Sequence, residues 1–260
     1  MTADPSLLIA VLALFFALVF LGLWLAAKKR LAALKTAPKA AAAPAPAPSE
    51  RDPRSAALCE EMVATQKEVI ITLAELVEFR SHESATHVER VAAFAAIFAE
   101  ILGLDADVSL LITEAAPMHD IGKIGLPDYI IHKPGALTTD ELKVMRSHTN
   151  IGHDILAKHD RPLFRMAATI ALEHHERWDG SGYPRNLRGE AISLPGRIVA
   201  LCDVFDSLSN ARPYKEAWPL EKTVKFIEDG AGHHFDPALV DHMTEHMDRF
   251  LKVLVAKRDR

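Results

Sequence analysis

The first hydrophobic feature of the chain is an unbroken apolar run over residues 7–27. As a helix rising about 1.5 Å per residue, this run would cross roughly 30 Å of hydrocarbon. Residues 28–30 (Lys-Lys-Arg) follow it, whereas Asp4 and no basic residue precede it. Because basic flanks stay in the cytoplasm, residues 1–30 are predicted to form a single-pass anchor in the inner (cytoplasmic) membrane, with the rest of the chain in the cytoplasm. A cleaved signal peptide would carry its positive charge before the apolar stretch, so an uncleaved anchor is favoured.

Two segments of different character follow the apolar run. Residues 31–54 are dominated by Ala and Pro, which cannot bury a core and favour an extended linker. Over residues 58–79 an amphipathic helix is predicted, because apolar residues recur at three- and four-residue steps, namely Leu58, Met62, Val69, Leu73 and Leu76. This helix is either a dimerisation stalk or an element whose apolar face packs on the following domain, since the pattern is too short to identify a coiled coil.

Helical periodicity continues almost to the end of the chain. Apolar residues keep a helical spacing over residues 88–102, 110–119, 140–156, 164–175 and 194–209. No run of alternating apolar and polar residues indicates a sheet. We therefore predict an all-α fold, in which one helical domain over residues 55–260 is preceded by the transmembrane helix and the linker.

Composition narrows the classes of function. The 260 residues carry a formal net charge of −5, and no long Lys/Arg block occurs in the predicted domain, so a long nucleic acid is not expected as a partner. The two cysteines, Cys59 and Cys202, lack the paired spacing of a zinc site or a disulfide framework. These features leave an ordinary globular domain in a reducing compartment.

The candidate chemistry resides in eight nitrogen and oxygen donors in or beside the predicted helices. They are Glu83, His87, His119, Asp120, His148, His174, His175 and Asp203. Glu83 and His87 are four residues apart and so project from one helical face. In the adjacent pairs, His119–Asp120 and His174–His175, the two side chains would point in different directions on a helix. Both members of a pair can therefore bind metal only where a helix end meets the cluster, and this favours more than one ion. Asp203 lies in an otherwise apolar segment, where an unpaired carboxylate would cost several kcal/mol.

Each of these residues has an ordinary structural explanation when it is taken alone. A single buried histidine is commonly a hydrogen-bonded core residue, and Asp203 could pair with a nearby arginine, Arg197 or Arg212. The motifs around the donors change this balance. Residues 119–125 read His-Asp-Ile-Gly-Lys-Ile-Gly, and residues 174–184 read His-His-Glu-Arg-Trp-Asp-Gly-Ser-Gly-Tyr-Pro.

With these motifs the sequence resembles the HD-GYP family of phosphodiesterases, from about Glu83 to Val240. The likeness includes residues 133–135 (Lys-Pro-Gly), 212–215 (Arg-Pro-Tyr-Lys) and 235–237 (Phe-Asp-Pro). By this resemblance the domain is of the HD type. Its ligands would form an HD set (His87, His119, Asp120 and Asp203) and a second site (His148, His174 and His175), and Glu83 matches the carboxylate of members that hold a third ion. The residues flanking Glu83 differ from the family pattern, so the number of divalent ions, two or three, remains open.

The resemblance implies a phosphodiesterase that hydrolyses cyclic di-GMP by attack of a metal-bound hydroxide, and it leaves open whether pGpG or GMP is the final product. Two ions would activate water and neutralise phosphoryl charge, with Asp120 as the bridging carboxylate. A histidine-rich set without thiolates suits iron or manganese. Lys123, Arg212 and Lys215 are expected to contact substrate phosphates, and Tyr183 to lie on the substrate side of a loop. The alternatives are a catalytically silent cyclic-dinucleotide receptor or scaffold and a hydrolase of another nucleotide, such as cyclic GMP-AMP. A homodimer or a signalling protein is a further expected partner.

Overall fold

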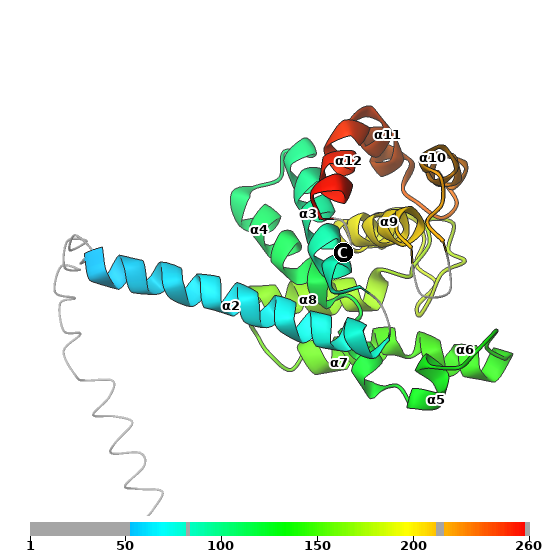
Figure 1. Ribbon diagram of the computed structural model, residues 1–260, viewed down its shortest axis with the longest axis horizontal. Helices are drawn as coiled ribbons and strands as arrows, with labels where there is room; N and C mark the ends of the chain where they lie inside the picture. Colours follow the sequence, from blue (N-terminus) through cyan, green and yellow to red (C-terminus); the bar gives the residue numbers. More distant parts are fainter. Residues whose placement is uncertain (1–52, 82–83, 212–215, 258–260) are drawn as a thin grey trace, which may run out of the picture. The chain divides into compact units, whose positions relative to one another are not determined.

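A computed structural model describes residues 53–81, 84–211 and 216–257 and shows helices joined by short loops (Figure 1). The chain divides into two compact units, residues 1–58 and 59–260, and the core and the site belong to the second. The elements are α2 (Pro53–Arg80), α3 (Ala85–Ile101), α4 (Ala106–Ala115), η1 (Ala116–Met118), η2 (Ile121–Gly125), α5 (Asp128–Ile131), α6 (Thr139–Arg146), α7 (His148–Leu156), α8 (Pro162–Glu173), η3 (Gly189–Ala191), α9 (Leu194–Ser209), α10 (Leu220–Asp229), α11 (Pro237–Glu245) and α12 (Met247–Ala256). The all-helical part of the predicted fold is confirmed.

The transmembrane part of the prediction is corrected. Within the ranges that the structure describes, no helix is both long enough and apolar enough to cross a membrane. The segment predicted to span, residues 7–27, lies outside those ranges. The predicted inner-membrane localisation depended on such a helix and is not supported.

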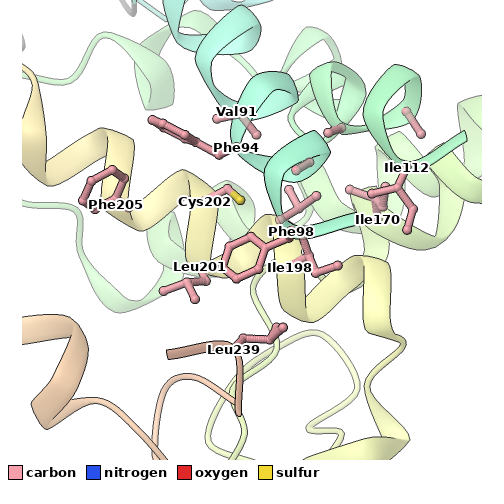
Figure 2. Close-up of a cluster of buried hydrophobic side chains, with 14 of the residues drawn as sticks. Val91, Phe94, Phe98, Ile112, Ile170, Ile198, Leu201, Cys202, Phe205 and Leu239 are labelled. Carbon is pink, nitrogen blue, oxygen red and sulfur yellow. The ribbon is translucent and has the colours of Figure 1, made fainter. Parts of the chain in front are cut away.

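The core lies between α3, α8 and α9 (Figure 2), and α11 and α12 also pack against α3. Helix α3 contributes Phe94 and Phe98, which are fully buried because apolar residues recur on one of its faces. The Phe94 ring meets Phe205 of α9 at 5.3 Å in an edge-to-face arrangement, and Phe98 meets Phe250 of α12 at 5.1 Å between ring centroids. Cys202 is completely buried in this core, and burial raises the pKa of its thiol, so it remains a small neutral core residue.

Helix α2 has two apolar faces, and only one of them is packed. Ala74 and Val77 are buried against the domain. Met62, Val69, Leu73 and Leu76, the face identified in the sequence, are 51–60 % exposed. The alternative in which this face packs on the following domain is therefore wrong, while the dimerisation stalk stays a prediction.

The predicted helix over residues 140–156 is two helices that meet at Ser147. The Ser147 backbone N–H and hydroxyl both donate to the Val144 carbonyl, at 3.1 and 2.6 Å, and so end α6. Helix α7 begins at the next residue, His148. The break turns His148 inward at the start of a helix, where it can reach the residues around Asp120.

Candidate metal centre

Six of the predicted donors lie at the ends of helices, and Asp203 projects toward them from within α9. Ser84 caps α3 by accepting a hydrogen bond from the Thr86 N–H, which places His87 in the first turn. Both adjacent pairs sit at helix ends, as their spacing requires, with His119 and Asp120 between η1 and η2, and His174 and His175 at the end of α8. Seven side chains from distant parts of the sequence thus converge.

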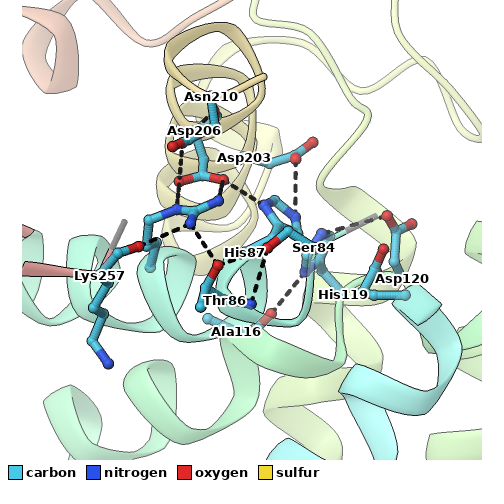
Figure 3. A network of polar contacts seen from close by, with 12 residues as sticks. Ser84, Thr86, His87, Ala116, His119, Asp120, Asp203, Asp206, Asn210 and Lys257 are labelled. Atoms are coloured by element: carbon cyan, nitrogen blue, oxygen red, sulfur yellow. Dashed lines mark hydrogen bonds and ion pairs between the residues drawn. The ribbon is translucent and has the colours of Figure 1, made fainter. Parts of the chain in front are cut away.

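The donors form two neighbouring groups, and within each group all ligand atoms lie within 4.8 Å of one another. One group contains Asp120, His148, His174 and His175, and the other contains His87, His119 and Asp203. Figure 3 shows the second group beside Asp120. The groups touch, since Asp120 Oδ2 lies 3.5 Å from His119 Nε2, while Asp120 Oδ1 lies 3.1 Å from His148 Nε2. Two ions could be held side by side with Asp120 between them.

The hydrogen bonds of three histidines point their Nε2 atoms into this space. The Nδ1 atoms of His119, His148 and His174 bond to the backbone carbonyls of Ala116, Met145 and Ile170 at 2.8–3.1 Å. A carbonyl only accepts, so each Nδ1 carries a proton, and in the neutral form of the ring Nε2 presents a lone pair. His119 Nε2 and Asp120 Oδ1 are buried without a hydrogen-bond partner, although His148 Nε2 is only 3.1 Å from the latter. Lone pairs that face one another in a buried site fit a cation, and this tautomer pattern is the one found in metal-binding histidines.

Burial and neighbouring charges favour the protonation states that a cation requires. Burial lowers the pKa of His119 and of His175, which keeps both imidazoles neutral. Burial alone would raise the pKa of Asp120, but the ammonium of Lys123 and the nearby imidazoles outweigh it, so the pKa lies well below its usual range. The two neutral imidazoles of His119 and His175, close to the ionised Asp120 carboxylate, suit the binding of a divalent cation.

Comparison with known proteins identifies the family. Residues 45–239 match the family model described as HD domain, which covers most of the chain. The chain belongs to the HD domain family. This assignment confirms the resemblance to HD-GYP phosphodiesterases inferred from the motifs.

Curated relatives of this HD domain protein are cyclic-dinucleotide phosphodiesterases. It is 44 % identical over 188 residues to the Cyclic di-GMP phosphodiesterase response regulator RpfG of Xanthomonas campestris, covering 72 % of this chain and 50 % of that protein. It is 41 % identical over 202 residues to 3'3'-cGAMP-specific phosphodiesterase 2 of Vibrio cholerae, covering 78 % of this chain and 39 % of that protein. The chain thus spans about half or less of the length of these relatives. A V. cholerae cyclic GMP-AMP phosphodiesterase structure superposes with a TM-score of 0.58 at 19 % identity, over 72 % of this chain and 50 % of that one, which shows a shared fold.

Asp206, which the sequence analysis missed, supports the HD domain site from behind. Its Oδ2 lies 2.8 Å from His87 Nδ1, and its carboxylate accepts from the Arg90 guanidinium at 2.5 and 2.9 Å (Figure 3). Burial by itself would lower the pKa of His87, but the hydrogen bond and charge of Asp206 outweigh it and raise the pKa to about 9. Asp206 therefore fixes the orientation of the His87 ring. In this orientation His87 Nε2 lies 3.5 Å from Asp203 Oδ1.

The η2 segment carries Lys123 into the same site. Its ammonium lies 2.7 Å from Asp120 Oδ2 and 3.4 Å from the Oε2 atom of Glu78, a buried carboxylate on α2 that the sequence analysis also missed. Glu78, His119 and Asp120 form a third group whose oxygen and nitrogen atoms lie within 4.8 Å. Lys123 is thus placed beside the candidate ions rather than on the outer surface.

Tyr183, in the loop at residues 180–184, lies against the candidate metal-binding histidines. Its ring stacks on His175 at 4.9 Å between centroids, and the Arg146 guanidinium lies 4.8 Å from the centroid of the Tyr183 ring. Burial raises the pKa of the Tyr183 hydroxyl, so it stays protonated. Gly182 allows the loop to fold back, because a Cβ there would lie 2.3 Å from the Arg177 nitrogen. The other predicted site residues, Glu83, Arg212 and Lys215, lie outside the described residues.

Proposed function

We propose that this HD domain chain is a metal-dependent phosphodiesterase that hydrolyses cyclic di-GMP to pGpG and onward to GMP. The observation that carries the proposal is the convergence of buried imidazole nitrogens on the ionised carboxylate of Asp120. The His119 Nε2 and Asp120 Oδ1 atoms are buried there without a hydrogen-bond partner, which is costly for polar atoms unless a cation binds them. Relatives at 41–44 % identity that are named as cyclic-dinucleotide phosphodiesterases support the reaction class.

Seven described residues would hold two ions, one in each group, with Asp120 shared between them. The set lacks thiolates and is rich in imidazole, which fits iron or manganese. Glu83 is proposed as the ligand of a third ion. When bound, divalent ions lower the pKa of coordinated water and neutralise the phosphoryl oxygens.

The protein's own residues would then bind and orient the substrate. Lys123 presents an ammonium beside the two groups and is proposed to neutralise a non-bridging phosphate oxygen. Arg212 and Lys215 are proposed to contact the second phosphate. Tyr183, in contact with His175 and Arg146, offers a protonated hydroxyl and a flat ring beside the candidate ligands, and we propose that it packs against the bound dinucleotide.

A second candidate substrate is 3'3'-cGAMP, because one of the relatives is named as specific for that molecule at nearly the same identity as the cyclic di-GMP enzyme. Both substrates carry the same pair of phosphodiesters. The metal groups would therefore act identically on either one, and the choice would depend on contacts to the bases.

The test is to load the purified full chain anaerobically with Fe²⁺ or Mn²⁺ and separate the products of each cyclic dinucleotide by chromatography. We expect release of pGpG, followed by GMP, from cyclic di-GMP. His119→Ala and Asp120→Ala should abolish turnover, whereas Asp229→Ala, a change at an exposed surface aspartate, should leave it unchanged. Binding of the dinucleotide to metal-loaded protein without any product would instead identify a receptor.

A further inference from the structure

The last turn of α2 contacts both the backbone carbonyl and the side-chain ammonium of Lys123. The Arg80 Nη1 atom donates to the carbonyls of Lys123 and Ile124 at 2.9 and 2.8 Å, and Nη2 donates to the Leu126 carbonyl at 2.6 Å. Two residues earlier on the helix, the Glu78 carboxylate reaches the Lys123 ammonium at 3.4 Å. One helical turn of α2 therefore bonds to backbone carbonyls of η2 and also contacts the Lys123 side chain.

Glu78 is held in place from its own helix. Only 1 % of the residue is exposed, and the Ser81 hydroxyl donates to its Oε2 atom at 3.2 Å. A buried carboxylate is strongly destabilising unless a cation compensates it. Its position beside His119 and Asp120 leaves two roles open, a further metal ligand or the counter-charge of Lys123.

The competition for Asp120 favours the second role. The Lys123 ammonium is closer to Asp120 Oδ2, at 2.7 Å, than to Glu78. Asp120 is also the carboxylate common to the neighbouring ligand groups, so divalent ions would claim its oxygens and repel the ammonium. Glu78 supplies a negative charge that keeps Lys123 in the site when Asp120 binds metal.

We propose that Glu78 is a positioning residue that holds the Lys123 ammonium toward the substrate phosphate, while Arg80 anchors the backbone that carries it. This inference rests on the proposed function, in which Lys123 contacts phosphate. Helix α2 then becomes part of the machinery of the site, although its outer face is exposed.

The test compares Glu78→Gln, Lys123→Met and the double variant in the full, metal-loaded chain. Gln keeps the shape of Glu but removes the charge, so we expect kcat/KM to fall about tenfold or more through misplacement of the ammonium. Metal content per chain should equal that of the wild type. The double variant should be no slower than Lys123→Met alone, because Glu78 has nothing left to position. Glu68→Gln, at an exposed position of the same helix, is the matched control and should behave as the wild type.

The outcomes separate this inference from the proposed function. Loss of bound metal in Glu78→Gln would make Glu78 a ligand and overturn the positioning role, as would losses that multiply in the double variant. Wild-type turnover in Lys123→Met would remove the role of Lys123 itself, and an inactive wild type would remove the proposed function. If Glu78→Gln does not fold, Glu78→Asp retains the charge but withdraws it by one methylene, and wild-type kcat/KM in that variant would overturn the inference.

Discussion

Replacing Gly122 by alanine tests whether close packing of η2 on α7 builds the metal centre. A Cβ at Gly122 would lie 1.9 Å from the His148 carbonyl oxygen and 2.5 Å from the Gly152 nitrogen. Both partners are backbone atoms of α7, which cannot rotate away. The two segments would have to separate by about 1.1 Å for the first contact to reach 3.0 Å.

The expected loss of metal and of stability follows from the size of this separation. Asp120, two residues before Gly122, has its Oδ1 atom 3.1 Å from His148 Nε2, so a separation of this size breaks up their shared group. Overpacking against backbone costs about 3 kcal/mol, which in a domain of this size lowers Tm by roughly 6–12 °C. We expect the variant to lose metal as well as stability.

The assay is thermal unfolding together with metal analysis of Gly122→Ala and Gly125→Ala. Gly125 lies in the same motif, but its added Cβ would meet only the Ile151 side chain, at 2.9 Å, which can shift. Gly125→Ala should therefore lose less than about 1 kcal/mol and keep its metal. A Gly122→Ala protein with wild-type Tm and metal content would refute the argument that this approach shapes the site.

Three further outcomes are expected. Asp206→Asn should destabilise the fold by about 3–5 kcal/mol, because it removes the charge of a buried carboxylate that bonds to both Arg90 and His87, and denaturant unfolding measures this cost. The pKa of Glu141 is lowered to about 2 by the Lys133 hydrogen bond and the α6 cap, so its contribution to stability is complete above pH 4.5 and lost as pH falls toward 2; an NMR titration should find this midpoint. Leu76→Glu on the exposed face of α2 should convert the predicted dimer to a monomer in sedimentation analysis, and a monomeric wild type would contradict the dimer.

Sequence periodicity was sufficient to predict the helical class and several helix positions. The predicted helix over residues 194–209 coincides with α9, and the one over 88–102 nearly coincides with α3. Both have continuous apolar faces that pack in the core. The break at Ser147 was not predictable from periodicity, because apolar spacing continues through it and only the bonds to the Val144 carbonyl end α6.

The candidate donors were identifiable because the motifs around them, at residues 119–125 and 174–184, resemble those of HD-GYP phosphodiesterases, whereas each donor alone has an ordinary structural explanation. The supporting charges were harder to find. Glu78 lies on an amphipathic helix rich in glutamates, where a solvated carboxylate is the ordinary expectation, and only the fold buries it. Asp206 lies in the same apolar helix as Asp203, three residues later, so the argument applied to Asp203 could have identified it.

The positions of Glu78 and Asp206 show how the site balances charge before any cation binds. Asp206 compensates Arg90 and orients His87 on one side, and Glu78 approaches Lys123 on the other. Each carboxylate therefore serves a cationic or imidazole side chain, while Asp120 and Asp203 face the histidines, Asp120 with the Lys123 ammonium at 2.7 Å. Because Asp120 immediately precedes η2 and Asp203 lies in α9, cations bound at the two adjacent groups would link segments that are far apart in the sequence.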